Sequence, residues 1–155
     1  MKILFICSSN ICRSAFCDFV FNKMVREDII LRSKVERVDS AAVFNRSRKL
    51  FPKTYRYLTS IGYNEEELKA FKPRYYRDHL DIFDEADIII GMTKSHYTLL
   101  PRKYKPKFIT LSEVTIGEYK AIPDPWLRLT QKRFNKDMQE IEKYLEIYKE
   151  KLKKM

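Results

Sequence analysis

The stretch ILFICSSNICRSAFCDFV, residues 3–20, joins an apolar run to a short polar segment and then to an amphipathic pattern. The apolar run KILFIC, residues 2–7, is typical of a strand that is buried on both faces of a parallel sheet. After Ser14, apolar side chains recur at helical spacing, which predicts a helix over 14–28. The polar segment therefore connects the carboxyl end of a strand to the N-terminus of a helix.

The rest of the chain repeats this alternation of strand and helix. Strand–helix alternation predicts an α/β fold: a four-stranded parallel open sheet with helices on both faces, a Rossmann-like arrangement in one domain, residues 1–155. In such sheets ligands bind at the carboxyl ends of the strands. The further strands are expected at 34–42, 86–92 and 106–111, and the further helices from Pro52 to Gly62, from Thr93 to Leu100 and from Thr130 onward; the last carries an apolar core stripe of Phe134, Met138, Ile141, Leu145, Tyr148 and Leu152.

The composition narrows the classes of function. No apolar run approaches the length of a transmembrane helix, and the first residues turn polar too early for a signal peptide. Three cysteines without paired spacing argue against a disulfide framework and favour a reduced, cytoplasmic protein. The 31 Lys and Arg residues are mixed with 21 acidic ones, so we interpret the net charge of +10 as a solvated surface, with neither nucleic acid nor a membrane as partner.

The polar segment has the features of a phosphate-binding loop. A loop before a helix N-terminus points backbone N–H groups at a common centre, where the helix dipole also favours an anion. Arg13 can bind two phosphate oxygens with its planar guanidinium, and Ser14 can donate a hydrogen bond to the sulfur of Cys7. The same field favours the thiolate of Cys7, which suits nucleophilic attack on phosphorus. The predicted loop comprises Ser8, Ser9, Asn10, Ile11, Cys12 and Arg13.

A general acid is needed to protonate the departing oxygen of a phosphate ester. Asp124 lies between two prolines on a predicted loop after the fourth strand, which places it at the same sheet edge as Cys7. An Asp-Pro step can also be a simple turn. Glu113 and Glu118, expected on the same loop, are the next candidates. Trp126 offers an aromatic wall for a flat substrate ring.

These segments resemble a known family. CSSNICRS, together with VDSAA, FDEADIIIGM and IPDPW in the same order, resembles the signature segments of the low-molecular-weight protein tyrosine phosphatases over nearly the whole chain. The resemblance implies the phosphotyrosine phosphatase I type of fold, hydrolysis of phosphotyrosine in proteins by a monomer, and no metal or cofactor. By similarity, Cys7 is the nucleophile, Arg13 the phosphate clamp, Asp124 the acid that later activates water and Ser14 the stabiliser of the thiolate; Asn10 and Ser40 brace the loop.

Other positions have secondary roles. Ile11 and Trp126 are expected to line the substrate ring. Cys12 resembles the second loop cysteine of the family, which can form a disulfide with the nucleophile; as an alternative it is a small filler. Cys17 is expected in the core. His79 and His96 have no metal-ligand spacing and are interpreted as surface or helix residues.

The chain departs from the family pattern at several positions. The family commonly has glycine where Ser9 stands, and a serine would be strained there if the loop needs a positive φ. Proline is common where Ala15 stands, histidine where Phe71 stands, and an aromatic residue where Leu127 stands. These changes bear on substrate preference.

Three alternatives differ in chemistry. Arsenate reductases share the fold and need two further cysteines downstream, whereas all three cysteines here lie by residue 17. Arginine phosphatases of the same family usually have threonine where Ile11 stands. A non-catalytic phosphate-binding module would lack the nucleophile or the acid, and Cys7 and Asp124 are both present.

Overall fold

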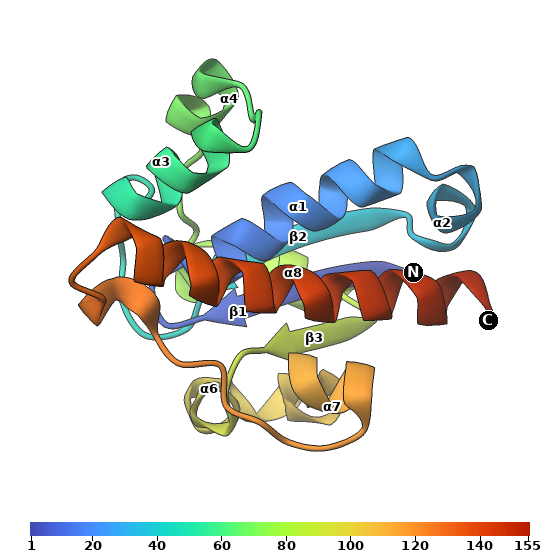
Figure 1. Cartoon of the computed structure of the whole chain (residues 1–155). Helices are drawn as coiled ribbons and strands as arrows, with labels where there is room; N and C mark the ends of the chain where they lie inside the picture. Colours follow the sequence, from blue (N-terminus) through green and yellow to red (C-terminus); the bar gives the residue numbers. More distant parts are fainter.

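The computed structural model describes all 155 residues and contains one parallel sheet (Figure 1). Its strand order is β2-β1-β3-β4, so the chain moves from β1 to one side and then to the other. The carboxyl end of β1 is therefore the point where the strand order reverses, which is where ligands bind in open α/β sheets. The predicted fold is confirmed; the strands are β1 Lys2–Cys7, β2 Arg37–Ala42, β3 Ile88–Gly91 and β4 Phe108–Thr110.

The long helices agree with the sequence pattern to within one or two residues. Four helices of six residues each were not expected, because so short a segment shows no clear helical period. One of them follows β4, so the expectation of an uninterrupted loop between the fourth strand and Asp124 is wrong. The helices are α1 Arg13–Glu27, α2 Ile29–Lys34, α3 Pro52–Ser60, α4 Glu65–Ala70, α5 Leu80–Glu85, α6 Lys94–Leu99, α7 Leu111–Ile116 and α8 Gln131–Lys153, with short 3-10 turns η1 Tyr76–Asp78, η2 Arg102–Lys107 and η3 Pro125–Leu127.

Each face of the sheet buries its own apolar cluster. Successive side chains of a strand point to opposite faces, and in β1 Phe5 belongs to the larger cluster whereas Ile6 belongs to the smaller one. The larger cluster packs α1 and α8 against the sheet, as Figure 1 shows for α8 lying along the strands. The smaller cluster holds α5 and η2, where Phe83 and Tyr104 are in ring contact.

The stripe predicted for the last helix is confirmed, because all six of its apolar side chains are buried on α8. Thr130 caps this helix by accepting a hydrogen bond from the N–H of Arg133. Cys17 is fully buried on α1, as expected for a core residue. None of the helices combines the length and the apolar character needed to cross a lipid bilayer.

Candidate active site

Two carbonyls of the loop between β1 and α1 accept hydrogen bonds from segments outside the loop. The carbonyl of Ser8 accepts hydrogen bonds from the N–H groups of Phe44 and Asn45, and the carbonyl of Ile11 accepts one from the Thr54 hydroxyl at 2.9 Å. In a trans peptide the N–H group points opposite to the carbonyl. With these carbonyls held outward, the N–H groups that follow them face the inside of the loop, as an anion-binding cradle requires.

The loop has one residue in the left-handed region, and it is not Ser9. Asn10 is the only residue other than glycine with a positive φ, at 57°. Asparagine tolerates this conformation better than most residues. The strain considered for a serine in place of the family's glycine therefore does not arise. Ser9 instead donates its hydroxyl to Oδ1 of Asn45 at 2.6 Å and so ties the loop to the segment after β2.

A chain of hydrogen bonds leads from Arg74 through Asn10 and Ser14 to the sulfur of Cys7. The Oγ of Ser14 lies 2.9 Å from Sγ of Cys7, and Nδ2 of Asn10 donates to the same Oγ at 2.9 Å. Because the serine oxygen already accepts from Asn10, its own hydrogen is free to point at the sulfur. The backbone N–H of Arg74 donates to Oδ1 of Asn10 at 3.0 Å and fixes the amide. This geometry supports Ser14 as a stabiliser of the thiolate.

Ser40 does not brace the loop directly, contrary to the expectation. Its hydroxyl donates to Oδ2 of Asp18 at 2.5 Å, and the Arg74 guanidinium lies 3.7 Å from the same carboxylate oxygen. Burial raises the pKa of Asp18 to about 6. The carboxylate of Asp18, on α1, lies next to Ser40 and takes its hydrogen bond. Ser40 is therefore linked to the loop only indirectly, through Asp18 and Arg74. Asn10 is the one member of the predicted pair that contacts the loop network itself.

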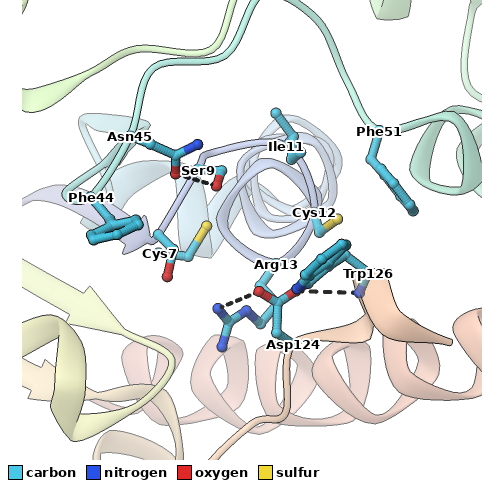
Figure 2. Close-up of a pocket in the computed structure, with 11 residues that line it drawn as sticks. Cys7, Ser9, Ile11, Cys12, Arg13, Phe44, Asn45, Phe51, Asp124 and Trp126 are labelled. Atoms are coloured by element: carbon cyan, nitrogen blue, oxygen red, sulfur yellow. Dashed lines mark hydrogen bonds and ion pairs between the residues drawn. The ribbon is translucent and has the colours of Figure 1, made fainter.

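Arg13 and Asp124 meet across the mouth of the loop (Figure 2). The Arg13 guanidinium is buried, and its NH1 donates to the carbonyl of Ile122 at 2.9 Å. Its NH2 lies 3.4 Å from Oδ2 of Asp124, whose side chain is 38% exposed. The other oxygen of Asp124 accepts the N–H of Trp126 at 3.3 Å, which holds the carboxylate at the start of η3. Asp124 thus reaches the phosphate loop, as predicted from its position after the last strand.

The residues enclose a pocket of about 430 Å³ with the sulfur of Cys7 in its wall. Three aromatic side chains stand around it: Phe44 after β2, Phe51 before α3, and Trp126, which is 54% exposed (Figure 2). Ile11 also lines it. Phe44 and Phe51 were not predicted, because Phe44 just after β2 and Phe51 at the start of α3 show no pattern in the sequence that links them to the loop. The lining comprises Cys7, Ser8, Ser9, Ile11, Cys12, Arg13, Phe44, Asn45, Phe51, Asp124 and Trp126.

The other candidate acids do not line this pocket. Glu113 belongs to α7, where its carboxylate accepts the hydroxyl of Thr110 at 2.7 Å in a capping box. Glu118 follows α7 and lies 3.4 Å from Lys120. Asp124 is therefore the carboxylate that lines the pocket together with Cys7.

His96 was expected to be a surface or helix residue; it lies on helix α6, but it is buried against the loop and is not at the surface. Its Nδ1 accepts the backbone N–H groups of Met92 and Thr93 at 3.2 and 3.3 Å. The proton therefore resides on Nε2, which lies 3.3 Å from the hydroxyl of Ser8. Burial, and next to it the charge of Arg13, lowers the pKa of His96 to about 3. Sequence reasoning missed this contact because the two residues are 88 positions apart.

Because His96 is held neutral in the folded chain, we expect the protein to lose stability in acid. The pKa of His96 is about 3 in the folded chain and 6.5 in the unfolded chain. Below pH 6.5 the unfolded chain therefore binds one proton more than the folded chain, so the free energy of unfolding decreases as the pH is lowered. His96→Asn keeps an acceptor for the two N–H groups but does not titrate. Between pH 7.5 and 4.5 we expect wild type to lose about 2–3 kcal/mol more than this variant in urea unfolding. Parallel losses would show that His96 is not held neutral.

Cys12 is a buried thiol in the same pocket wall as Cys7. Burial raises the pKa of Cys12 to about 12, so its thiol is protonated at neutral pH and attacks slowly. We expect peroxide to oxidise Cys7 to a sulfenic acid, which then condenses with Cys12 to a disulfide and releases water. Mass spectrometry should detect this disulfide, and a thiol should restore activity.

Two cysteine variants test this prediction. In Cys12→Ser the sulfenic acid of Cys7 has no thiol partner, so a second equivalent of peroxide should oxidise it to a sulfinic acid that thiols do not reduce, and activity should be lost irreversibly. Cys17→Ala, which changes a cysteine outside the pocket, should recover like wild type. Equal recovery of wild type and Cys12→Ser would refute the disulfide and leave Cys12 as a filler of the loop.

Comparisons with known proteins agree with this geometry. The family model described as low molecular weight phosphotyrosine protein phosphatase matches residues 2–155. The low molecular weight protein-tyrosine-phosphatase PtpB of Staphylococcus epidermidis is 30% identical over 128 residues, 81% of each chain. The YwlE arginine phosphatase from Geobacillus stearothermophilus superposes with a TM-score of 0.80 at 23% identity, over 97% of this chain and 92% of that one. The low molecular weight protein tyrosine phosphatase from T. tengcongensis gives 0.80 at 23% identity, over 97% and 99%. With a family model that spans the chain, this protein belongs to the low molecular weight phosphotyrosine protein phosphatase family.

Proposed function

We propose that residues 1–155 form one phosphatase domain that hydrolyses phosphotyrosine in proteins through a covalent cysteinyl-phosphate. The observation that carries this proposal is the meeting of three groups at one pocket: the sulfur of Cys7, the guanidinium of Arg13 and the carboxylate of Asp124. Each comes from the carboxyl end of the sheet or from the loop beyond it. The proposed chemistry uses only these side chains and water.

In the first step the thiolate of Cys7 attacks phosphorus. The S–P bond forms as the bond from phosphorus to the phenolic oxygen breaks, and protonated Asp124 gives its proton to that oxygen. The loop N–H groups and Arg13 bind the three phosphoryl oxygens, where negative charge is spread in the transition state. Ser14, whose Oγ lies 2.9 Å from the sulfur, can donate a hydrogen bond that stabilises the negative charge of the attacking thiolate.

In the second step water breaks the S–P bond. The Asp124 carboxylate accepts a proton from the attacking water, the phosphate leaves, and Cys7 returns as a thiolate stabilised by Ser14. Asp124 is suited to both steps because its carboxylate is at the mouth of the pocket, where it is 38% exposed and open to water. Its contact with Arg13 positions the carboxylate over the phosphate site.

The pocket wall favours an aryl group. Phe44, Phe51 and Trp126 present three rings around the loop, and Ile11 adds an aliphatic side chain where arginine phosphatases of the family usually have threonine. Rings of this kind pack on a tyrosine ring by offset or edge contacts. YwlE has the same fold and is an arginine phosphatase, so phosphoarginine is the second candidate substrate. No acidic side chain other than Asp124 lines the pocket to receive a guanidinium, which favours phosphotyrosine.

The proposal also covers the cellular compartment, the oligomeric state and the partners of the enzyme. Three free, buried cysteines fit a reducing cytoplasm, and we propose that the protein acts there as a monomer on phosphoproteins, without nucleic acid or membrane as partner.

Relative rates on matched peptides test the substrate. We expect kcat/KM for a phosphotyrosine peptide to exceed that for the phosphoserine and phosphoarginine versions by at least about tenfold, because only the aryl group contacts the rings. Trp126→Ala should raise KM for aryl phosphates about fivefold while changing alkyl phosphates little. A higher rate on phosphoarginine would assign this chain to the second candidate.

A further inference from the structure

A second pocket, of about 410 Å³, lies beside the first and has a basic rim. Its apolar floor includes Leu50 and Leu68, which are both buried, while three cationic side chains are exposed around them. We call it the basic pocket. Its lining comprises Lys49, Leu50, Pro52, Tyr55, Arg56, Leu68 and Lys69.

The cations of the basic pocket have no carboxylate partner. Lys49, Arg56 and Lys69 form none of the ion pairs of the molecule, and Arg56 donates only to the neutral amide of Gln131, at 3.3 Å. Three glutamates, Glu65–Glu67, form the first turn of α4 next to the lining, and Glu65 accepts the hydroxyl of Tyr55 at 2.7 Å. The rim therefore keeps three positive charges available to an external anion.

The sequence concentrates positive charge next to the catalytic pocket. Residues 45–58, NRSRKLFPKTYRYL, contain five Lys and Arg residues and no acidic residue. Of these five, Arg46 pairs with Asp78. Although positive charges are spread over the whole chain, those of residues 45–58 are close enough together to form a local positive field. This field acts over about one Debye length, ~8 Å at physiological salt.

The two pockets share a wall. Phe51 lines the catalytic pocket, and its neighbours Leu50 and Pro52 line the basic pocket. The backbone at 50–52 thus separates them. An extended peptide advances about 3.3 Å per residue, so a chain whose phosphorylated residue occupies the catalytic pocket reaches the basic pocket within a few residues.

We propose that the basic pocket binds acidic side chains that flank the phosphorylated residue of the substrate, so that this enzyme selects acidic phosphopeptides. The inference rests on the proposed function for the position of the phosphorylated residue. Aspartate or glutamate carboxylates fit because Arg56 offers a planar pair of donors and the lysines offer flexible ones. The apolar floor accommodates the methylene groups of the same side chains.

Charge reversal in the basic pocket tests the proposal. For a phosphotyrosine peptide with Asp and Glu flanks, Lys49→Glu/Arg56→Glu should lower kcat/KM about tenfold, because attraction is replaced by repulsion at two positions. For a peptide with Ala and Ser flanks the change should be less than about twofold. A small aryl phosphate should be hydrolysed as by wild type, since neither residue lines the catalytic pocket.

A matched control separates local from overall charge. Arg26→Glu/Arg32→Glu makes the same change in net charge at exposed positions without ion-pair partners, at the far end of α1 and on α2 (Figure 1). Arg26 is 13 residues along α1 from Arg13, about 20 Å at 1.5 Å per residue. This control should keep the preference for acidic peptides. An equal loss in both variants, or no loss in either, would overturn the proposal.

A binding experiment makes the result independent of catalysis. Fluorescence anisotropy of an unphosphorylated, Glu-rich peptide should show binding to wild type and to Arg26→Glu/Arg32→Glu, and about tenfold weaker binding to Lys49→Glu/Arg56→Glu. If no phosphorylated substrate were hydrolysed, the proposed function would fail while this result still stood. Binding to phosphatidylserine vesicles but not to the peptide would overturn the proposal in favour of a membrane surface.

Discussion

Cys7→Ser is expected to lower kcat for aryl phosphates by on the order of 10⁴-fold or more, since the variant lacks the group that forms the intermediate. A serine hydroxyl is protonated at neutral pH, and the hydrogen bond from Ser14 and the field of the loop do not make it an effective nucleophile. The loop amides and Arg13 remain in place. Inorganic phosphate should therefore still bind to the variant, as isothermal calorimetry would measure.

The matched control for this variant is Cys17→Ala. Cys17 is buried on α1 one turn beyond the loop and does not line the catalytic pocket. Its replacement should keep kcat near that of wild type, although the small cavity lowers the free energy of unfolding by about 1 kcal/mol. Near-normal turnover by Cys7→Ser would contradict the nucleophile assignment, whatever the behaviour of Cys17→Ala.

Asp124→Ala should slow the hydrolysis of phosphotyrosine by about 10²–10⁴-fold, the usual contribution of a positioned general acid. The phenolate of tyrosine is a poor leaving group that needs a proton in the transition state. A nitrophenolate leaves more easily without help, so aryl phosphates with acidic phenols should lose much less. A plot of log kcat/KM against the pKa of the leaving phenol should thus be steeper for the variant than for wild type.

The variant Asp124→Asn distinguishes a role of Asp124 as a proton donor from a role in shaping the turn. The amide oxygen of the variant side chain would still accept the N–H of Trp126, a hydrogen bond of 3.3 Å in the native chain, but the amide has no acidic proton to donate. We expect Asp124→Asn to show the same steep dependence on the leaving group as Asp124→Ala. A uniform loss for all phenols in Asp124→Ala, with normal activity in Asp124→Asn, would reduce Asp124 to a structural residue.

The sequence was sufficient to predict those site residues that lie at, or shortly after, the carboxyl end of a strand. Cys7 ends β1, and Asp124 follows the last strand, so parallel topology alone places both at one edge of the sheet. The spacing from Cys7 to Arg13 is that of a loop entering a helix, and the structure has both residues lining the same pocket. These relations are local or topological, and for this reason periodicity and order along the chain were enough.

The remaining contacts depend on side-chain packing between distant elements. His96 reaches Ser8 because α6 packs beside the loop, and its short helix gives no pattern that reveals this. Ser40 is within reach of Asp18 only because β2 lies against α1 in the folded chain. The basic pocket is formed by α3 and α4 together, and the sequence shows the excess of charge at 45–58 but not the cavity that receives it.

Trapping the intermediate tests the central claim most directly. Since Asp124 is proposed to activate water in the second step, Asp124→Ala mixed with an activated aryl phosphate should accumulate phosphoenzyme within one turnover. Acid quench, digestion and mass spectrometry should then find one phosphate on the sulfur of Cys7, in the peptide that contains residues 3–12. A burst of released phenol with phosphate on another residue, or with no phosphate bound to the protein, would contradict a covalent cysteinyl-phosphate at Cys7.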